Sequence, residues 1–246
     1  MLLKACVNGA RRPGEHLRLP VTTSAIALDV AAVVAAGADA VHLHVKDAQG
    51  ADTLGAAELA RVLAAVRAAA PDVPIGVTTG AWAVPDPVQR VAAIRSWTTM
   101  PDFASVNWHE SGADAVAAAL LDLGVDVEAG LWHAGAAQAW LSSPHRDRCS
   151  RVLLELPDGL AQAATEAEAN HLLDLVQGRT YGAMPVLLHG EGTSCRPALR
   201  HAVSKGLQVR IGFEDVLDLP DGSPAPDNAS LVRAAGELMG RSKPVG

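Results

Sequence analysis

Two histidines close an apolar run near residue 43, and their spacing suits the binding of a metal ion. Residues 41–47 read VHLHVKD. In an extended strand, residues two apart point to the same side, so His42 and His44 can converge on one ion while Leu43 faces away. Neutral imidazole is a common ligand of zinc. Two strand histidines can equally hydrogen-bond within a core, so the short motif alone leaves both interpretations open.

A second segment carries an arginine and two carboxylates. Residues 208–215 read QVRIGFED, in which positions 209, 211 and 213 are apolar. On a strand this alternation directs Arg210 and Glu214 to the inner face, where buried charges are costly unless they are paired or bind a ligand. If Glu214 approaches the two histidines, the three form a zinc site with an open fourth position, which is typical of catalysis. The alternative is an interior ion pair of Arg210 with Glu214 and no metal.

Asp215 ends the same segment and lies near Arg210. A carboxylate beside an arginine stays ionised and can act as a general base, although the arginine also lowers its basicity. A cap or turn role at the end of the strand is the alternative.

These residues lie far apart in the sequence, so the fold must bring the ends of several segments together. Short apolar runs alternate with Ala-rich amphipathic segments along all 246 residues, without a linker. This alternation is typical of βα units around a parallel sheet. The pattern predicts strands at Leu2–Asn8, Ala40–Val45, Ile75–Thr78, Phe103–Asn107, Val125–Leu131, Arg151–Leu156, Pro185–His189 and Gln208–Glu214. It predicts helices at Ser24–Ala36, Ala57–Ala70, Pro87–Trp97, Ala113–Leu123, Ala134–Leu141, Glu166–Val176, Pro197–Lys205 and Ala229–Gly240.

Eight βα units in 246 residues predict a single (β/α)8 TIM barrel over residues 1–246. A doubly wound open sheet is the alternative, but residues 8–14 lack the glycine spacing of its phosphate-binding turn. In a closed barrel strands one and eight are neighbours and strand two is next, which lets Glu214 approach the histidines. Function is then expected at the C-terminal ends of the strands.

Composition limits the partners of the protein. The 20 basic residues are outnumbered by 27 acidic ones, for a net charge of −7, so we expect no nucleic-acid partner. Three widely spaced cysteines argue for a reducing compartment. The sequence shows no apolar stretch long enough for a membrane span or a signal peptide, so we expect a cytoplasmic protein without a membrane partner.

Together these motifs resemble the β-keto acid cleavage enzymes, a family of zinc-dependent barrels. The resemblance rests on HLH at 42–44, TTG at 78–80, RIGFED at 210–215 and the opening ACVNGAR at 5–11. In that family a β-keto acid condenses with acetyl-CoA, and a retro-Claisen step then releases acetoacetate and a new acyl-CoA. The resemblance also implies a homo-oligomer.

Roles for individual residues follow from this resemblance. It implies that His42, His44 and Glu214 bind zinc or a similar divalent metal, and that Arg210 and Asp215 handle proton removal next to the ketone of a small anionic keto acid. Thr78 would help to hold that substrate, together with Thr79 and Gly80 of the same motif. The resemblance also implies that acetyl-CoA is the co-substrate.

Other residues become candidates by location. Arg11, in the first loop, matches a family position that varies with the charge of the substrate tail, and the alternative is a solvated loop arginine. Asn107 ends strand four, where a residue can contact substrate. Glu128 shares a strand face with Trp132, so it could support a zinc histidine or act as an acid–base group, and a buried ion pair is the alternative. His189 and Glu191 could supply a proton relay or a contact to the thioester.

Two other functions fit the same residues. One is a metal-dependent barrel aldolase, lyase or hydrolase that acts on a small keto acid without CoA. The other is a non-catalytic barrel that binds a keto acid or a metal. Consumption of acetyl-CoA separates the first from the family reaction, and turnover separates the second.

Overall fold

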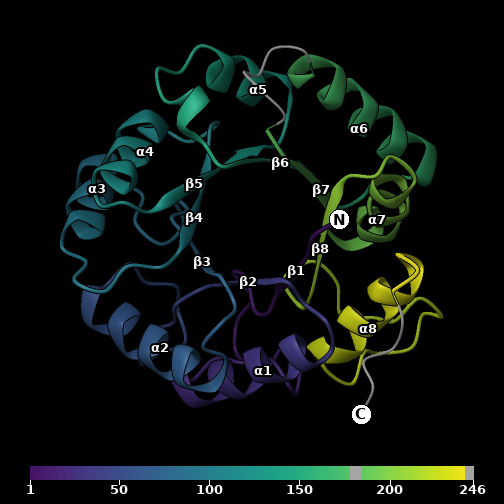
Figure 1. Ribbon diagram of the computed structural model, residues 1–246, viewed down its shortest axis with the longest axis horizontal. Helices are drawn as coiled ribbons and strands as arrows, with labels where there is room; N and C mark the ends of the chain where they lie inside the picture. The colour runs from purple at the N-terminus through teal and green to yellow at the C-terminus, as the bar shows by residue number, and fades with distance from the viewer. Residues whose placement is uncertain (178–183, 242–246) are drawn as a thin grey trace.

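A computed structural model describes residues 1–177 and 184–241. Eight parallel strands close into a barrel in chain order, with β1 hydrogen-bonded to β8, and the helices form an outer ring (Figure 1). The predicted (β/α)8 barrel is therefore confirmed. The strands are β1 (Leu3–Cys6), β2 (Ala40–Leu43), β3 (Ile75–Thr78), β4 (Phe103–Asn107), β5 (Asp126–Leu131), β6 (Arg151–Leu156), β7 (Val186–Gly190) and β8 (Gln208–Ile211). The helices are α1 (Thr23–Ala35), α2 (Ala56–Ala69), α3 (Pro87–Arg95), α4 (Ala113–Asp122), α5 (Ala134–Leu141), α6 (Gln162–Val176), α7 (Cys195–Ser204) and α8 (Asn228–Leu238).

The core lies between the sheet and the ring of helices. In α1, Ile26, Val30 and Val33 are buried and spaced to form one face of a helix. The apolar positions of β8, Val209 and Ile211, are also buried, as the alternation of this segment predicts. Each fully buried side chain of this size contributes about 1.5–3 kcal/mol. The apolar packing fixes the strands whose ends carry the polar site.

Three strands, β1, β2 and β8, end earlier than predicted, and the last two carry site residues just beyond their ends. β2 ends at Leu43 because the side chain of Asn8 replaces the next strand partner: its Oδ1 accepts from the His44 N–H at 2.8 Å and its Nδ2 donates to the His44 carbonyl at 3.0 Å. β8 ends at Ile211 because the Gly212 carbonyl accepts from the N–H of Asp215, at 2.9 Å, and so forms a turn. His44 and Glu214 therefore lie outside the strands but in fixed backbone.

Charged side chains fill the barrel where its strands begin. Lys4 Nζ donates to both carboxylate oxygens of Glu128, at 2.7 and 2.5 Å, and the two side chains are almost fully buried. Arg151 donates to the same carboxylate and to Gln208. We call Lys4, Glu128, Arg151 and Gln208 the barrel floor.

The structure corrects the prediction that Glu128 serves the substrate site. Glu128 is in register with Arg151, the first residue of β6, and this stagger places its carboxylate at the start of the strands. The buried ion pair, which the sequence left open, is the arrangement found.

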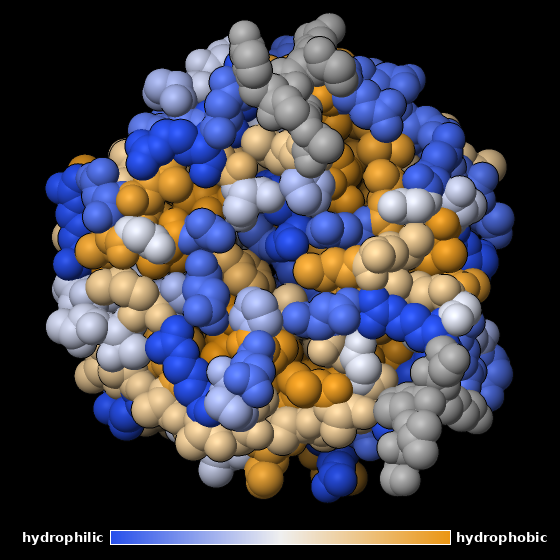
Figure 2. Space-filling model, in the orientation of Figure 1, coloured by the Kyte–Doolittle hydropathy of each residue, from blue (hydrophilic) through white to orange (hydrophobic). Residues whose placement is uncertain are grey.

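Within residues 1–177 and 184–241, no helix is long and apolar enough to cross a bilayer. On the face shown in Figure 2, hydrophilic side chains gather near the centre of the ring.

Asp29, a largely buried residue of α1, makes stability depend on pH. Its carboxylate accepts from Asn228 Nδ2, which also donates to the Val7 carbonyl. Burial raises the pKa of Asp29 to about 7, and the neighbouring Asp227 adds to the rise. The unfolded chain releases this proton at its ordinary pKa of about 3.9. The stabilisation is therefore complete below that value and is lost as pH rises through 7.

Asp29→Asn removes this titration. Relative to wild type, the free energy of unfolding of the variant should rise by on the order of 2–4 kcal/mol between about pH 4 and pH 8. Urea unfolding at both pH values measures this difference, in which the other titrating groups cancel. If the free energy of unfolding of the variant relative to wild type is the same at both pH values, the raised pKa of Asp29 is contradicted.

Candidate active site

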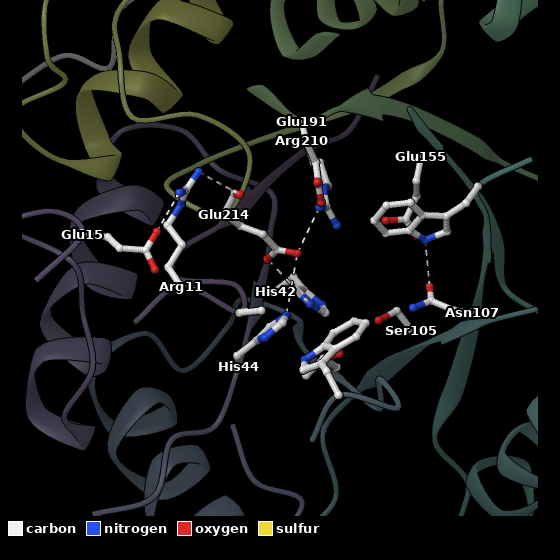
Figure 3. A pocket seen from close by; sticks show the side chains of 14 residues that line it. Arg11, Glu15, His42, His44, Ser105, Asn107, Glu155, Glu191, Arg210 and Glu214 are labelled. Carbon is white, nitrogen blue, oxygen red and sulfur yellow. Dashed lines mark hydrogen bonds and ion pairs between the residues drawn. The ribbon is translucent and has the colours of Figure 1, made fainter. Parts of the chain in front are cut away.

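A pocket of about 350 Å³ opens where the strands end. It brings together eight of the residues singled out from the sequence, which come from distant parts of the chain (Figure 3). They are Arg11, His42, His44, Thr78, Asn107, Glu191, Arg210 and Glu214. The rest of the lining is Ala10, Glu15, Trp82, Ser105, Trp132 and Glu155.

The Glu214 carboxylate points between the two histidines (Figure 3). Its Oε2 lies 3.9 Å from His42 Nε2, and its Oε1 lies 3.7 Å from His44 Nε2. One ligand atom from each of the three residues lies within 4.8 Å of the others. Oε2 is buried and has no hydrogen-bond partner in the described part of the chain. A divalent ion between the three groups would satisfy this oxygen, so the donor set fits zinc.

Burial and neighbouring charges set the protonation of these ligands. Burial lowers the pKa of His42 to about 4, so this imidazole is neutral and ready to bind a metal. Burial also acts to lower the pKa of His44, but the carboxylates of Glu214 and Asp52 outweigh it and raise the value to about 9. For Glu214, burial is outweighed by Arg210 and the histidines, which hold its pKa well below the usual range. Metal binding at this site releases protons.

Behind His44 lies Asp52, which the sequence analysis did not single out. Its Oδ2 lies 2.8 Å from His44 Nδ1 and accepts from Trp82 Nε1 at 2.8 Å, while its Oδ1 accepts from Lys46 Nζ at 2.5 Å. The Trp82 ring is stacked on His44, with centroids 5.8 Å apart and planes 14° apart.

Arg210 joins the two carboxylates that follow β8. Its NH2 group donates to Glu214 Oε1 at 3.0 Å and to Asp215 Oδ1 at 2.7 Å, and its Nε donates to Asp215 at 3.1 Å. The predicted proximity of Arg210 and Asp215 is confirmed. Asp215 is fully buried behind the pocket wall, and its Oδ2 has no hydrogen-bond partner among the described residues. Arg210 therefore holds one oxygen of Asp215, and the other is left without a partner in this part of the structure.

Gly212 allows the turn after β8 to approach β1. A Cβ at this position would overlap the backbone of Cys6, and Gly212 stands between Arg210 and Glu214. Gly212→Ala should therefore lower the free energy of unfolding by about 1–3 kcal/mol, measured by urea unfolding. Gly236→Ala is the control, because a Cβ there would have room within α8. Equal effects of the two variants would contradict this explanation.

A second group of titratable side chains lies between β6 and β8. His189 Nε2 lies 3.2 Å from Glu155 Oε2, and His189 Nδ1 lies 3.5 Å from Asp215 Oδ1. Burial raises the pKa of Glu191 to about 7, and the charge of Asp215 adds to this effect. Glu155 and Glu191 line the pocket, whereas His189 is buried behind it.

The residues of the TTG motif at 78–80 differ in position: one lines the pocket and the other two lie behind its wall. Thr78 lines the pocket, and its Oγ1 accepts from the Gly80 N–H at 3.1 Å. Thr79 does not line it, because its hydroxyl donates to the Ser105 carbonyl at 2.7 Å and so joins β3 to β4. Gly80 does not line it either, since the Trp82 ring covers the place where a side chain would project. These two residues, predicted to bind substrate, are instead placed to support the wall.

Asn107 and Arg11 do reach the pocket. Asn107 donates to Glu110 at 3.0 Å and accepts from Trp132 Nε1 at 3.2 Å. Arg11 donates to the Phe213 carbonyl, and at 3.1 Å to Glu15. Its guanidinium lies at the rim, and 24% of its side chain is exposed.

The fold and the site together define a (β/α)8 barrel with a His-His-Glu cluster at the C-terminal ends of its strands, a set of groups that could hold a metal ion. The sequence model of one family, the beta-keto acid cleavage enzymes, matches residues 1–243. The chain belongs to this family.

Solved structures support the fold. The ternary complex of ObcA with C4-CoA adduct and oxalate is 16% identical, with a TM-score of 0.65 over 91% of this chain and 64% of that one. The binary complex of ObcA with oxaloacetate is also 16% identical, with a TM-score of 0.66 over 89% and 63%. This chain therefore spans less than two thirds of the length of those ObcA chains.

A third structure matches along its full length. Orotidine 5'-monophosphate decarboxylase from Methanocaldococcus jannaschii is 10% identical, with a TM-score of 0.56 over 98% of this chain and 99% of that one. At these identities the likenesses establish the barrel alone. The search of curated sequences gave no match.

Proposed function

We propose that the protein is a zinc-dependent β-keto acid cleavage enzyme that uses acetyl-CoA as co-substrate and releases acetoacetate and a new acyl-CoA. The observation that carries this proposal is the convergence of His42, His44 and Glu214 on one point of the pocket, with Glu214 Oε2 left without a partner in the described chain. Family membership supplies the reaction class. ObcA complexes with oxaloacetate and with a C4-CoA adduct support a keto acid and a CoA thioester as substrates.

Zinc bound by His42, His44 and Glu214 would polarise the ketone and stabilise the enolate formed next to it. Asp215 Oδ2 is the proton acceptor in this proposal, and the two bonds from Arg210 to Oδ1 fix its orientation. Thr78 lines the pocket and has a hydroxyl that can donate to a substrate carboxylate.

Arg11 and Asn107 extend this substrate site. The guanidinium of Arg11 stands at the rim, where it can pair with an anionic substrate tail. Asn107 is held between Glu110 and Trp132 and presents a fixed amide to the pocket. A volume of about 350 Å³ suits a small keto acid.

Mass spectrometry tests this function. Zinc-loaded protein is incubated with acetyl-CoA and a panel of small β-keto acids, and the products are examined for acetoacetate together with a new acyl-CoA. Both products must form, and neither may form without acetyl-CoA. Consumption of a keto acid without acetyl-CoA would establish the aldolase, lyase or hydrolase alternative instead, and binding without turnover across the panel would establish a non-catalytic protein.

A further inference from the structure

Asp52 is a buried carboxylate that is held by contacts with neighbouring side chains. It lies in the loop after β2 and is almost fully buried, at 6% side-chain exposure. Its carboxylate contacts three side chains, which are those of His44, Lys46 and Trp82. His44 is a candidate metal ligand, and Trp82 lines the pocket. Lys46 neutralises its charge and also donates to the carbonyls of Gly9 and Arg11, at 2.7 and 3.0 Å.

The contact with His44 determines which ring nitrogen faces the metal position. An ionised carboxylate only accepts hydrogen bonds, so Asp52 requires a proton on His44 Nδ1. The opposite nitrogen, Nε2, faces Glu214, 3.7 Å away, and presents its lone pair there once metal binding has displaced its proton. This is the carboxylate–histidine–metal arrangement, in which the outer carboxylate fixes the ring and raises its basicity as a ligand.

Asp52 also joins this ligand to one wall of the pocket. The oxygen that contacts His44 Nδ1 is the same Oδ2 that accepts from Trp82 Nε1. The indole is stacked on the imidazole, and Trp82 is half-exposed at the pocket mouth. His44 and Trp82 are therefore joined both by a shared acceptor oxygen and by stacking of their rings.

We propose that Asp52 is a positioning residue, which holds His44 in the orientation that binds the metal and joins the metal site to the aromatic wall formed by Trp82. The inference rests on the proposed function for the identity of the metal site. It makes Asp52 and Trp82 part of the site in this chain, although neither binds the metal.

Zinc affinity, measured by competition with a chromogenic chelator, tests the inference without any turnover. Asp52→Asn keeps an acceptor but loses the charge and should weaken zinc binding about tenfold, and Asp52→Ala should weaken it up to about 100-fold. Asp47→Asn is the matched control on the same loop, because Asp47 accepts from the N–H groups of Gln49 and Ala51 but contacts no histidine. It should stay within about threefold of wild type.

Two spectroscopic readouts separate positioning from a purely structural role. In zinc-loaded protein with labelled histidine, NMR should show a slowly exchanging Nδ1 proton on His44 in wild type and a faster one in Asp52→Ala. Zinc should change the tryptophan emission of wild type, and this change should be absent in Trp82→Phe and in Asp52→Ala.

Three results would overturn the inference. They are zinc binding in Asp52→Ala within about threefold of wild type, an equal loss of affinity in Asp47→Asn and Asp52→Asn, and an unchanged zinc response in Trp82→Phe. Wild-type protein that binds zinc but converts no keto acid would overturn the proposed function and leave this inference standing.

Discussion

Glu214→Gln is expected to lose its zinc and to lower kcat/KM by about 1000-fold or more. Glutamine is nearly the same size and can still accept from Arg210, but it replaces the one charged ligand by a neutral amide. In the proposed function, polarisation of the ketone by the metal would supply several kcal/mol, and each factor of ten in rate corresponds to about 1.4 kcal/mol. The loss should therefore affect kcat as well as substrate binding.

Metal content by mass spectrometry and steady-state kinetics check this result together. Glu58→Gln is the matched control, because it makes the same change on α2, where Glu58 contacts Arg61 at 2.8 Å and does not line the pocket. The control should keep both metal and activity. A Glu214→Gln protein with one zinc per chain and wild-type kinetics would disprove the metal assignment.

Among these variants, Lys4→Met is expected to give the largest decrease in the free energy of unfolding, without changing the candidate metal site. Lys4 and Glu128 are almost fully buried partners, and removing one of them leaves a buried carboxylate with Arg151 as its remaining cation. Breaking a buried pair in this way costs about 3–5 kcal/mol, because the remaining charge is neither hydrated nor fully paired. Urea unfolding should show this decrease, while the affinity for zinc stays that of wild type.

The double variant Lys4→Met/Glu128→Leu identifies the cause. Removing both charges removes the uncompensated carboxylate, so the double variant should be more stable than Lys4→Met alone. If the loss of stability in the double variant equals the sum of the losses in Lys4→Met and in Glu128→Leu, the unpaired charge is not the reason for the instability. If zinc affinity falls in either variant, the barrel floor is not separate from the site.

Alternation along single strands was enough to predict much of the site. His42 and Arg210 each lie on a strand whose apolar residues face the helices, so their inward direction follows from a period of two. The closed order of the strands then brings β8 and β2 to either side of β1. Eight βα units in a chain of this length are sufficient to predict that closure.

Alternation could not predict the height of a residue within the barrel. Glu128 faces inward, but the stagger of β5 against β6 pairs it with Arg151 and so places it in the floor. Register between strands depends on the packing of the whole sheet. The pairing of Glu155 with His189 across β6 and β7 depends on register in the same way.

Contacts between loops were also beyond reach of the sequence. Trp82 and Asp52 are 30 residues apart, in loops that follow different strands, and neither belongs to an alternating pattern. Their meeting depends on the paths of both loops. The same reason applies to Trp132, which reaches Asn107 from the end of another strand.

The barrel floor has a consequence for how ligands come and go. Among the residues that the structure describes, Lys4, Glu128, Arg151 and Gln208 contact one another across the barrel axis beneath the pocket, as expected of a packed barrel core rather than a channel. We therefore expect substrates and products to enter and leave through the pocket mouth. In the proposed two-substrate reaction, the keto acid must occupy the inner part of the pocket before the bulkier thioester covers the entrance. Initial-rate kinetics should therefore follow an ordered sequence in which the thioester, added in excess before the keto acid, inhibits the reaction.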